Sequence, residues 1–159
     1  MRIIENVSLR EKELWAELLI DLLVAAYYYP RAISLMTEGT AAMAGREMAG
    51  LVASTIVFAI VAGIVLFGTI HYHGETEKAD ERDFRFEISS NRVAYWSLNF
   101  FLVLILSLLT INEFASRPMP GAFILEAGPL GVGQLILLAI FLASITRVTT
   151  QLFHYRRSV

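Results

Sequence analysis

Four long apolar segments separated by polar connections make up most of this chain. One of them, residues 48–70, carries no formal charge between Glu47 and His71. A helix rises about 1.5 Å per residue, so a segment of this length covers roughly the 30 Å hydrocarbon core of a bilayer. The other three segments are also apolar but include polar residues. The pattern predicts an all-α, integral membrane protein whose spans occupy residues 14–29, 48–70, 93–111 and 130–152.

Composition agrees with a membrane protein. Hydrophobic residues make up 56% of the chain and the mean hydropathy is +0.58, whereas soluble domains contain about 45–50% apolar residues. A length of 159 residues leaves room for one compact four-helix bundle, so we expect a single transmembrane domain over residues 1–159 and no separate catalytic domain. The absence of cysteine excludes disulfides and thiolate nucleophiles, and a net charge of −2 does not favour nucleic acid as a partner.

Local signals place the helix boundaries. Ser8 followed by Glu11 matches a capping box, which predicts that a helix begins directly after Ser8. Pro30 predicts an end or a kink of that helix. We expect residues 32–45 to form a short outer connection and residues 113–129, rich in proline and glycine, to form a turn-rich loop.

Basic residues predict the orientation, because Lys and Arg accumulate on the cytoplasmic side of a membrane. If the N-terminus is inside, the inner side holds all the basic residues except Arg31, Arg46 and Arg117. We therefore expect both termini and the connection between the second and third spans to lie in the cytoplasm.

That middle connection leads into the third span through a charged segment with helical spacing. Phe84, Ile88 and Tyr95 share one side of the helix. Three interpretations are open: a capped, solvated helix start, a docking surface for a soluble cytoplasmic partner, and a divalent metal site, although the spacing matches no calcium loop. The charged residues that would contact a partner are Asp80, Glu81, Arg82, Asp83, Glu87 and Arg92.

The same segment carries a resemblance. The motif 80–83 followed by Glu87, Asn91 and Arg92 before an apolar span, with residues 155–157 near the end of the chain, resembles a family of small, four-span bacterial membrane proteins of unknown function. The resemblance covers mainly the second half of the chain. It implies a multi-pass protein of the bacterial cytoplasmic (inner) membrane, and it implies no activity or catalytic residues.

Two acids within the first span are the strongest chemical signal. Glu17 and Asp21 are one helical turn apart and share a face, and each ionisable group in a span costs roughly 2.5–3.5 kcal/mol on insertion scales. Arg147 in the fourth span lies at a comparable depth. We interpret Arg147 as the counter-ion of Asp21 or Glu17 in a structural bridge. The alternative is a proton or cation site.

Cofactor chemistry has weaker support. His71 and His73 point to different sides of a helix, so they cannot bind one iron from the same face, although His154 could join either. We expect no haem, no metal and no other cofactor. No catalytic triad order, phosphate loop or dinucleotide motif is present, and we expect the protein not to be an enzyme.

Small and polar residues suggest how the spans pack. Gly50 with Ser54, and Ala59 with Gly63, predict close helix approach along the second span. Most polar residues of the last two spans are expected to form hydrogen bonds between helices; they include Ser97, Asn99, Ser107, Thr110, Ser144, Thr146 and Thr149.

These observations favour a non-enzymatic structural, assembly or regulatory component of the membrane. Its partners would be the lipid bilayer and a cytoplasmic protein, and a homo-oligomer is compatible with the sequence. The alternative is a proton-coupled small transporter or channel that uses Glu17 and Asp21.

Overall fold

A computed structural model describes residues 8–72, 80–114 and 129–157. Each of the four predicted spans lies within one helix, and each helix is long and apolar enough to cross a membrane. No strand occurs among the described residues, so the all-helical class is confirmed. The helices are α1 (Leu9–Thr37), α2 (Thr40–Met43), α3 (Arg46–Tyr72), α4 (Glu81–Phe114) and α6 (Pro129–Arg157).

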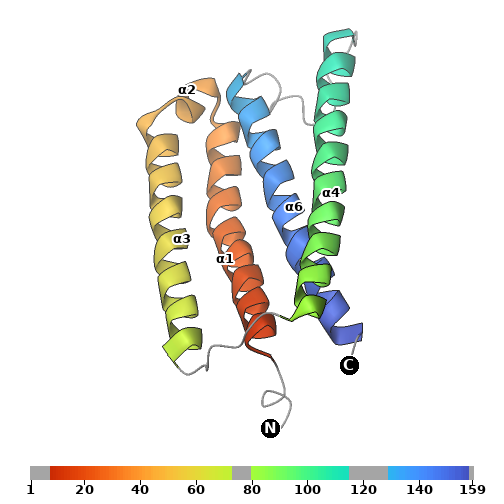
Figure 1. Ribbon diagram of the computed structural model, residues 1–159. Coiled ribbons are helices and arrows are strands. Elements are labelled where there is room, and N and C mark those ends of the chain that lie inside the picture. Colours follow the sequence, from red (N-terminus) through yellow and green to blue (C-terminus); the bar gives the residue numbers. More distant parts are fainter. Residues whose placement is uncertain (1–7, 73–79, 115–128, 158–159) are drawn as a thin grey trace.

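The four long helices lie in a row in the order α3, α1, α6, α4, and neighbours in the row run antiparallel (Figure 1). Close packing joins α3 to α1, α1 to α6, and α6 to α4. The helices therefore form an open layer, whereas the sequence predicted a four-helix bundle. The start of α1 and the end of α6 share one end of the layer, which we call the Leu9 end. That this end faces the cytoplasm stays a prediction.

Helix α1 begins where the capping box predicts. The Oγ atom of Ser8 accepts a hydrogen bond from the backbone N–H of Glu11 at 3.2 Å, which confirms Ser8 as the N-cap. The sequence predicts an end or a kink at Pro30, and the end is wrong because α1 continues through Pro30 to Thr37. Packing explains the continuation: Ala32, two residues beyond the proline, is fully buried, and this contact outweighs one missing backbone hydrogen bond.

Two clusters of buried side chains hold the layer together at opposite ends. The far cluster joins α1, α2 and α3, and the Leu9-end cluster joins α1 and α6, with Phe86 of α4 packed against it. Helix α3 has no buried residue beyond Leu51, so its Leu9 end is attached more loosely. The far cluster consists of Tyr28, Ala32, Met36, Met43, Met48 and Leu51. The Leu9-end cluster consists of Leu14, Val148, Leu152 and Tyr155.

The small residues of α3 do not bring another helix close. A Cβ atom added to Gly50 or Gly63 would meet nothing within 4 Å, so the predicted close approach along this face is wrong. The larger Met48 and Leu51 contact α1 instead. Ser54 does join the two helices, because its Oγ accepts a hydrogen bond from the hydroxyl of Tyr27 at 3.2 Å.

Candidate functional site

A line of polar contacts, which we call the α1–α6 seam, crosses between the two central helices. Because these helices are antiparallel, residues with increasing numbers on α1 contact residues with decreasing numbers on α6. The seam begins at the Leu9 end and reaches the half of both helices that is farther from it. Its contacts are Glu11 with Arg156 at 3.0 Å, Glu17 with Arg147, Asp21 with Ser144 at 2.8 Å and Tyr28 with Gln134 at 2.8 Å.

An ion pair forms the second contact of the seam. Nη2 of Arg147 donates to Oε1 of Glu17, so the structure brings together two of the three intramembrane charges that the sequence singled out. The side chains remain 29% and 34% exposed, respectively. Opposite charges in contact lower the cost of keeping either one within a span. The pair therefore joins the first and last spans.

Asp21 has a different partner. Its carboxylate accepts a hydrogen bond from the Oγ of Ser144, one turn of α6 before Arg147. The sequence placed Ser144 among residues that bond between helices but did not connect it with Asp21. The spacing in the sequence could have connected them: the two acids are four residues apart on α1, and Ser144 and Arg147 are three residues apart on α6.

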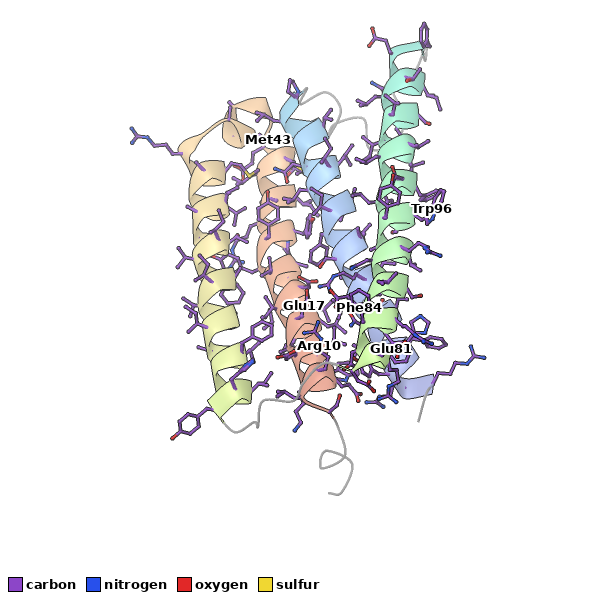
Figure 2. All side chains as sticks on the ribbon, viewed as in Figure 1. Arg10, Glu17, Met43, Glu81, Phe84 and Trp96 are labelled. Atoms are coloured by element: carbon purple, nitrogen blue, oxygen red, sulfur yellow. The ribbon has the colours of Figure 1, made fainter. Side chains whose placement is uncertain are left out.

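A charged cleft opens beside the ion pair. Its volume is about 330 Å³, and helices α1, α3 and α6 contribute to its walls. Figure 2 shows Arg10 and Glu17, both on α1, near the Leu9 end. Sequence reasoning missed this cleft, although Arg10, Glu13 and Glu17 share a face of α1. The lining residues are Arg10, Glu13, Leu14, Glu17, Phe67 and Arg147.

Further charges extend the network around the cleft. Glu13 contacts Arg10 at 3.1 Å on its own helix and the Nε2 of His71 on α3 at 3.3 Å. Arg10 also contacts Glu87 of α4 at 3.6 Å. The Leu9 end therefore carries ionic contacts from α1 to α4 and α6, and a contact between a carboxylate and an imidazole from α1 to α3.

The charged segment before the third span forms the start of α4. The backbone N–H of Asp80 donates to Asp83 at 2.9 Å, and the backbone N–H of Glu81 donates to Asp80 at 2.6 Å. The hydroxyl of Tyr155 also donates to Asp83. These contacts form a capped helix start, which is one of the three interpretations that the sequence left open. Asp80 and Asp83 accept hydrogen bonds within the chain, so fewer acidic groups are available to bind a partner.

The outward face of α4 stays uncovered. Phe84, Ile88 and Tyr95 are exposed large hydrophobic residues, and Arg85 and Arg92 lie exposed among them. We call these five residues the α4 strip. Figure 2 places Phe84 close to the start of α4. Several charges of this region, including Arg85 of the strip, contact partners within the chain: Arg82 lies over the ring of Phe86 at 5.8 Å, Glu81 pairs with Arg85 at 2.6 Å and Glu87 pairs with Arg10.

The two described histidines lie in separate environments. His71 contacts Glu13, whereas His154 lies 3.2 Å from the hydroxyl of Ser89 and stacks on Phe86. His73 lies outside the described residues. Within residues 8–72, 80–114 and 129–157, no group of three or more His, Cys, Asp or Glu side chains could hold a metal ion.

Most polar side chains of α4 bond to their own helix, which corrects the sequence expectation. Asn99, Ser107 and Thr110 donate to carbonyl oxygens four residues earlier. Such bonds satisfy a polar group without a neighbouring helix. Bonds between helices do occur at Ser97 with Thr146, at 3.5 Å, and at Ser144 with Asp21. Asn99 therefore does not extend the polar contacts of Asp21.

Four helices long and apolar enough to cross a membrane indicate a multi-pass membrane protein. In comparisons with protein-family models, curated proteins and solved structures, nothing matches the chain. The resemblance to four-span bacterial proteins stays a prediction. What the protein does therefore has to follow from its own contacts and charges.

Proposed function

We propose that the protein is a non-enzymatic structural, assembly or regulatory component of the bacterial cytoplasmic membrane, and that the α4 strip contacts a soluble partner in the cytoplasm. The observation that carries this proposal is the exposure of Phe84 and Ile88 in a charged segment that precedes the apolar part of α4. Exposed apolar residues rimmed by charge are typical of interaction surfaces. Arg85 and Arg92 would favour an acidic partner.

The α1–α6 seam supports a structural role for the intramembrane charges. Glu17 is matched by Arg147, and Asp21 accepts a hydrogen bond from Ser144. Such contacts set the register of two antiparallel helices because each donor meets its acceptor in only one alignment. A rigid pair of central helices would hold the α4 strip in a constant position, since α4 packs against α6.

Photo-crosslinking in living cells tests the docking surface. A photoreactive residue at Phe84 or Ile88 should give one protein adduct of constant size, and the double substitution Arg85→Glu and Arg92→Glu should remove it. Ile64 is the matched control, because it is 68% exposed on α3 compared with 63% for Phe84, but it lies within a span. The same adduct at Ile64, or no adduct on the strip, would refute the proposal.

The charged cleft favours one second candidate, a proton-linked transporter or channel. The cleft reaches Glu17, which a transporter could use to accept a proton from the cytoplasmic side. Proton flux into proteoliposomes distinguishes the two functions. Under the structural proposal, proteoliposomes that contain Glu17→Gln or Asp21→Asn show the same proton flux as the passive leak of protein-free liposomes. A flux that requires either carboxylate, in variants that remain folded, would favour transport instead.

A further inference from the structure

The charged cleft presents a balanced set of charges together with an apolar wall. Two guanidinium groups, from Arg10 and Arg147, face two carboxylates, from Glu13 and Glu17. The remaining lining residues are Leu14 and Phe67, so the wall is hydrophobic where α1 faces α3. A ligand that fits this lining carries an anion and a cation close together, with an apolar group attached.

The position of the cleft indicates where such a ligand comes from. The buried residues of α3 contact α1 in the far cluster, and α3 has no buried residue from there to the Leu9 end (Figure 1). Arg10 and Glu13 belong to the charged start of α1, just before its apolar part. With the membrane placement that the sequence predicts, the cleft therefore extends from the depth of lipid headgroups, at Arg10 and Glu13, to Glu17 within the first span, with Phe67 of α3 on one side.

Exposure of the charges excludes hydrocarbon as the filling. Arg10, Glu13, Glu17 and Arg147 all keep part of their side-chain surface accessible although each one is in an ion pair. Contact between these accessible charged atoms and lipid tails would be costly. Polar atoms, from water or from a headgroup, have to occupy the space beside them.

We propose that the cleft binds the zwitterionic headgroup of a phospholipid with a primary amine, of the phosphatidylethanolamine class. The phosphate lies between Arg10 and Arg147, because guanidinium groups match phosphate oxygens with paired hydrogen bonds. The ammonium donates to Glu13 and Glu17, and the acyl chains follow Phe67 toward the membrane interior. An anionic lipid without an amine would leave both carboxylates facing a phosphate.

Headgroup methylation gives the sharpest comparison. A choline headgroup keeps the phosphate and the positive charge but has no N–H to donate. We expect the purified full chain in detergent to bind short-chain phosphatidylethanolamine about 10-fold more tightly than phosphatidylcholine, since one charge-assisted hydrogen bond is worth roughly that factor. The measurement is the saturable rise in the thermal unfolding temperature with lipid concentration, with phosphatidylglycerol as a third lipid. Equal responses to all three lipids would overturn the proposal.

Variants separate the headgroup site from general lipid effects. Arg10→Gln and Glu13→Gln should each weaken phosphatidylethanolamine binding about 10-fold, and Arg10→Gln should weaken phosphatidylcholine binding as well, because both lipids carry a phosphate. Arg31→Gln, on the part of α1 far from the cleft, is the matched control and should leave binding unchanged. Binding that survives Arg10→Gln and Glu13→Gln would refute the site.

A soluble headgroup tests whether a lipid is the source. Glycerophosphoethanolamine carries the same phosphate and amine but no acyl chain. The lipid should bind much more tightly, because Phe67 contributes an apolar contact with the acyl chains that the soluble compound cannot make. Equal binding of the two would overturn the assignment to a lipid and would make the cleft a site for a free zwitterion.

Discussion

Substitution Arg147→Gln should lower the free energy of unfolding by about 2 kcal/mol, because it leaves Glu17 charged and unmatched within the first span. Breaking a fully buried ion pair costs about 3–5 kcal/mol, whereas an exposed pair contributes about 0–1 kcal/mol. The Glu17–Arg147 pair lies between these limits since about a third of each side chain is accessible, at 34% and 29%.

The double substitution Glu17→Gln and Arg147→Gln distinguishes a structural bridge from two independent groups. Removing both charges should recover more than half of the loss, since two neutral amides can still form a hydrogen bond between α1 and α6. Arg85→Gln is the matched control, because its pair with Glu81 lies on the exposed surface of α4 and should contribute less than about 0.5 kcal/mol. Unfolding of the detergent-solubilised protein, followed by circular dichroism, measures the free energy of unfolding of Arg147→Gln, of the double variant and of Arg85→Gln. Losses that simply add would contradict the bridge.

The ion pair also shows how far sequence reasoning reached. Helical periodicity put Glu17 and Asp21 on one face, and the antiparallel topology put Arg147 at their depth. Which acid Arg147 contacts depends on the rotation of α6 about its own axis, and hydropathy contains no information on that rotation. The hydroxyl of Ser144 fills the position beside Asp21, so the arginine meets Glu17.

The fold shows the same division between local and long-range information. The cap at Ser8 and the charge-free run 48–70 depend on neighbouring residues, and both predicted helix correctly. Pro30 does not end α1, because tertiary packing around Ala32 outweighs the local effect of the proline. The order of helices in the row was beyond prediction, because an apolar segment tolerates either lipid or another helix beside it. For that reason the small residues of α3 predicted packing that the layer does not contain.

The cleft was missed for a related reason. Arg10 and Glu13 are charges at the start of a helix, but Phe67 belongs to the charge-free run 48–70, for which the sequence predicted only a span and helix packing. The cleft lies where α3 no longer contributes buried residues to its contact with α1. Its charged and apolar walls come from three helices, and no local pattern indicates that they meet.

Two glutamines of α6 should respond in opposite directions to the same substitution. Gln151 is 1% exposed, and neither atom of its side-chain amide has a hydrogen-bond partner among the described residues. A buried polar group without a partner costs about 1–3 kcal/mol. Gln151→Met keeps the length of the side chain and removes both polar atoms, so it should raise the free energy of unfolding by about 1 kcal/mol or more.

Gln134→Met is the matched variant, because Gln134 accepts a hydrogen bond from the hydroxyl of Tyr28 at 2.8 Å. This substitution leaves the Tyr28 hydroxyl, in a buried residue, without its acceptor and should lower the free energy of unfolding by about 1–2 kcal/mol. Tyr28→Phe combined with Gln134→Met should recover part of that loss, since no donor then remains unpaired. A loss of stability in Gln151→Met, measured in the same detergent, would show that the amide of Gln151 does have a partner. Changes of opposite sign in the free energy of unfolding of Gln151→Met and Gln134→Met would establish that α6 gains stability from polar groups only where the seam supplies a partner.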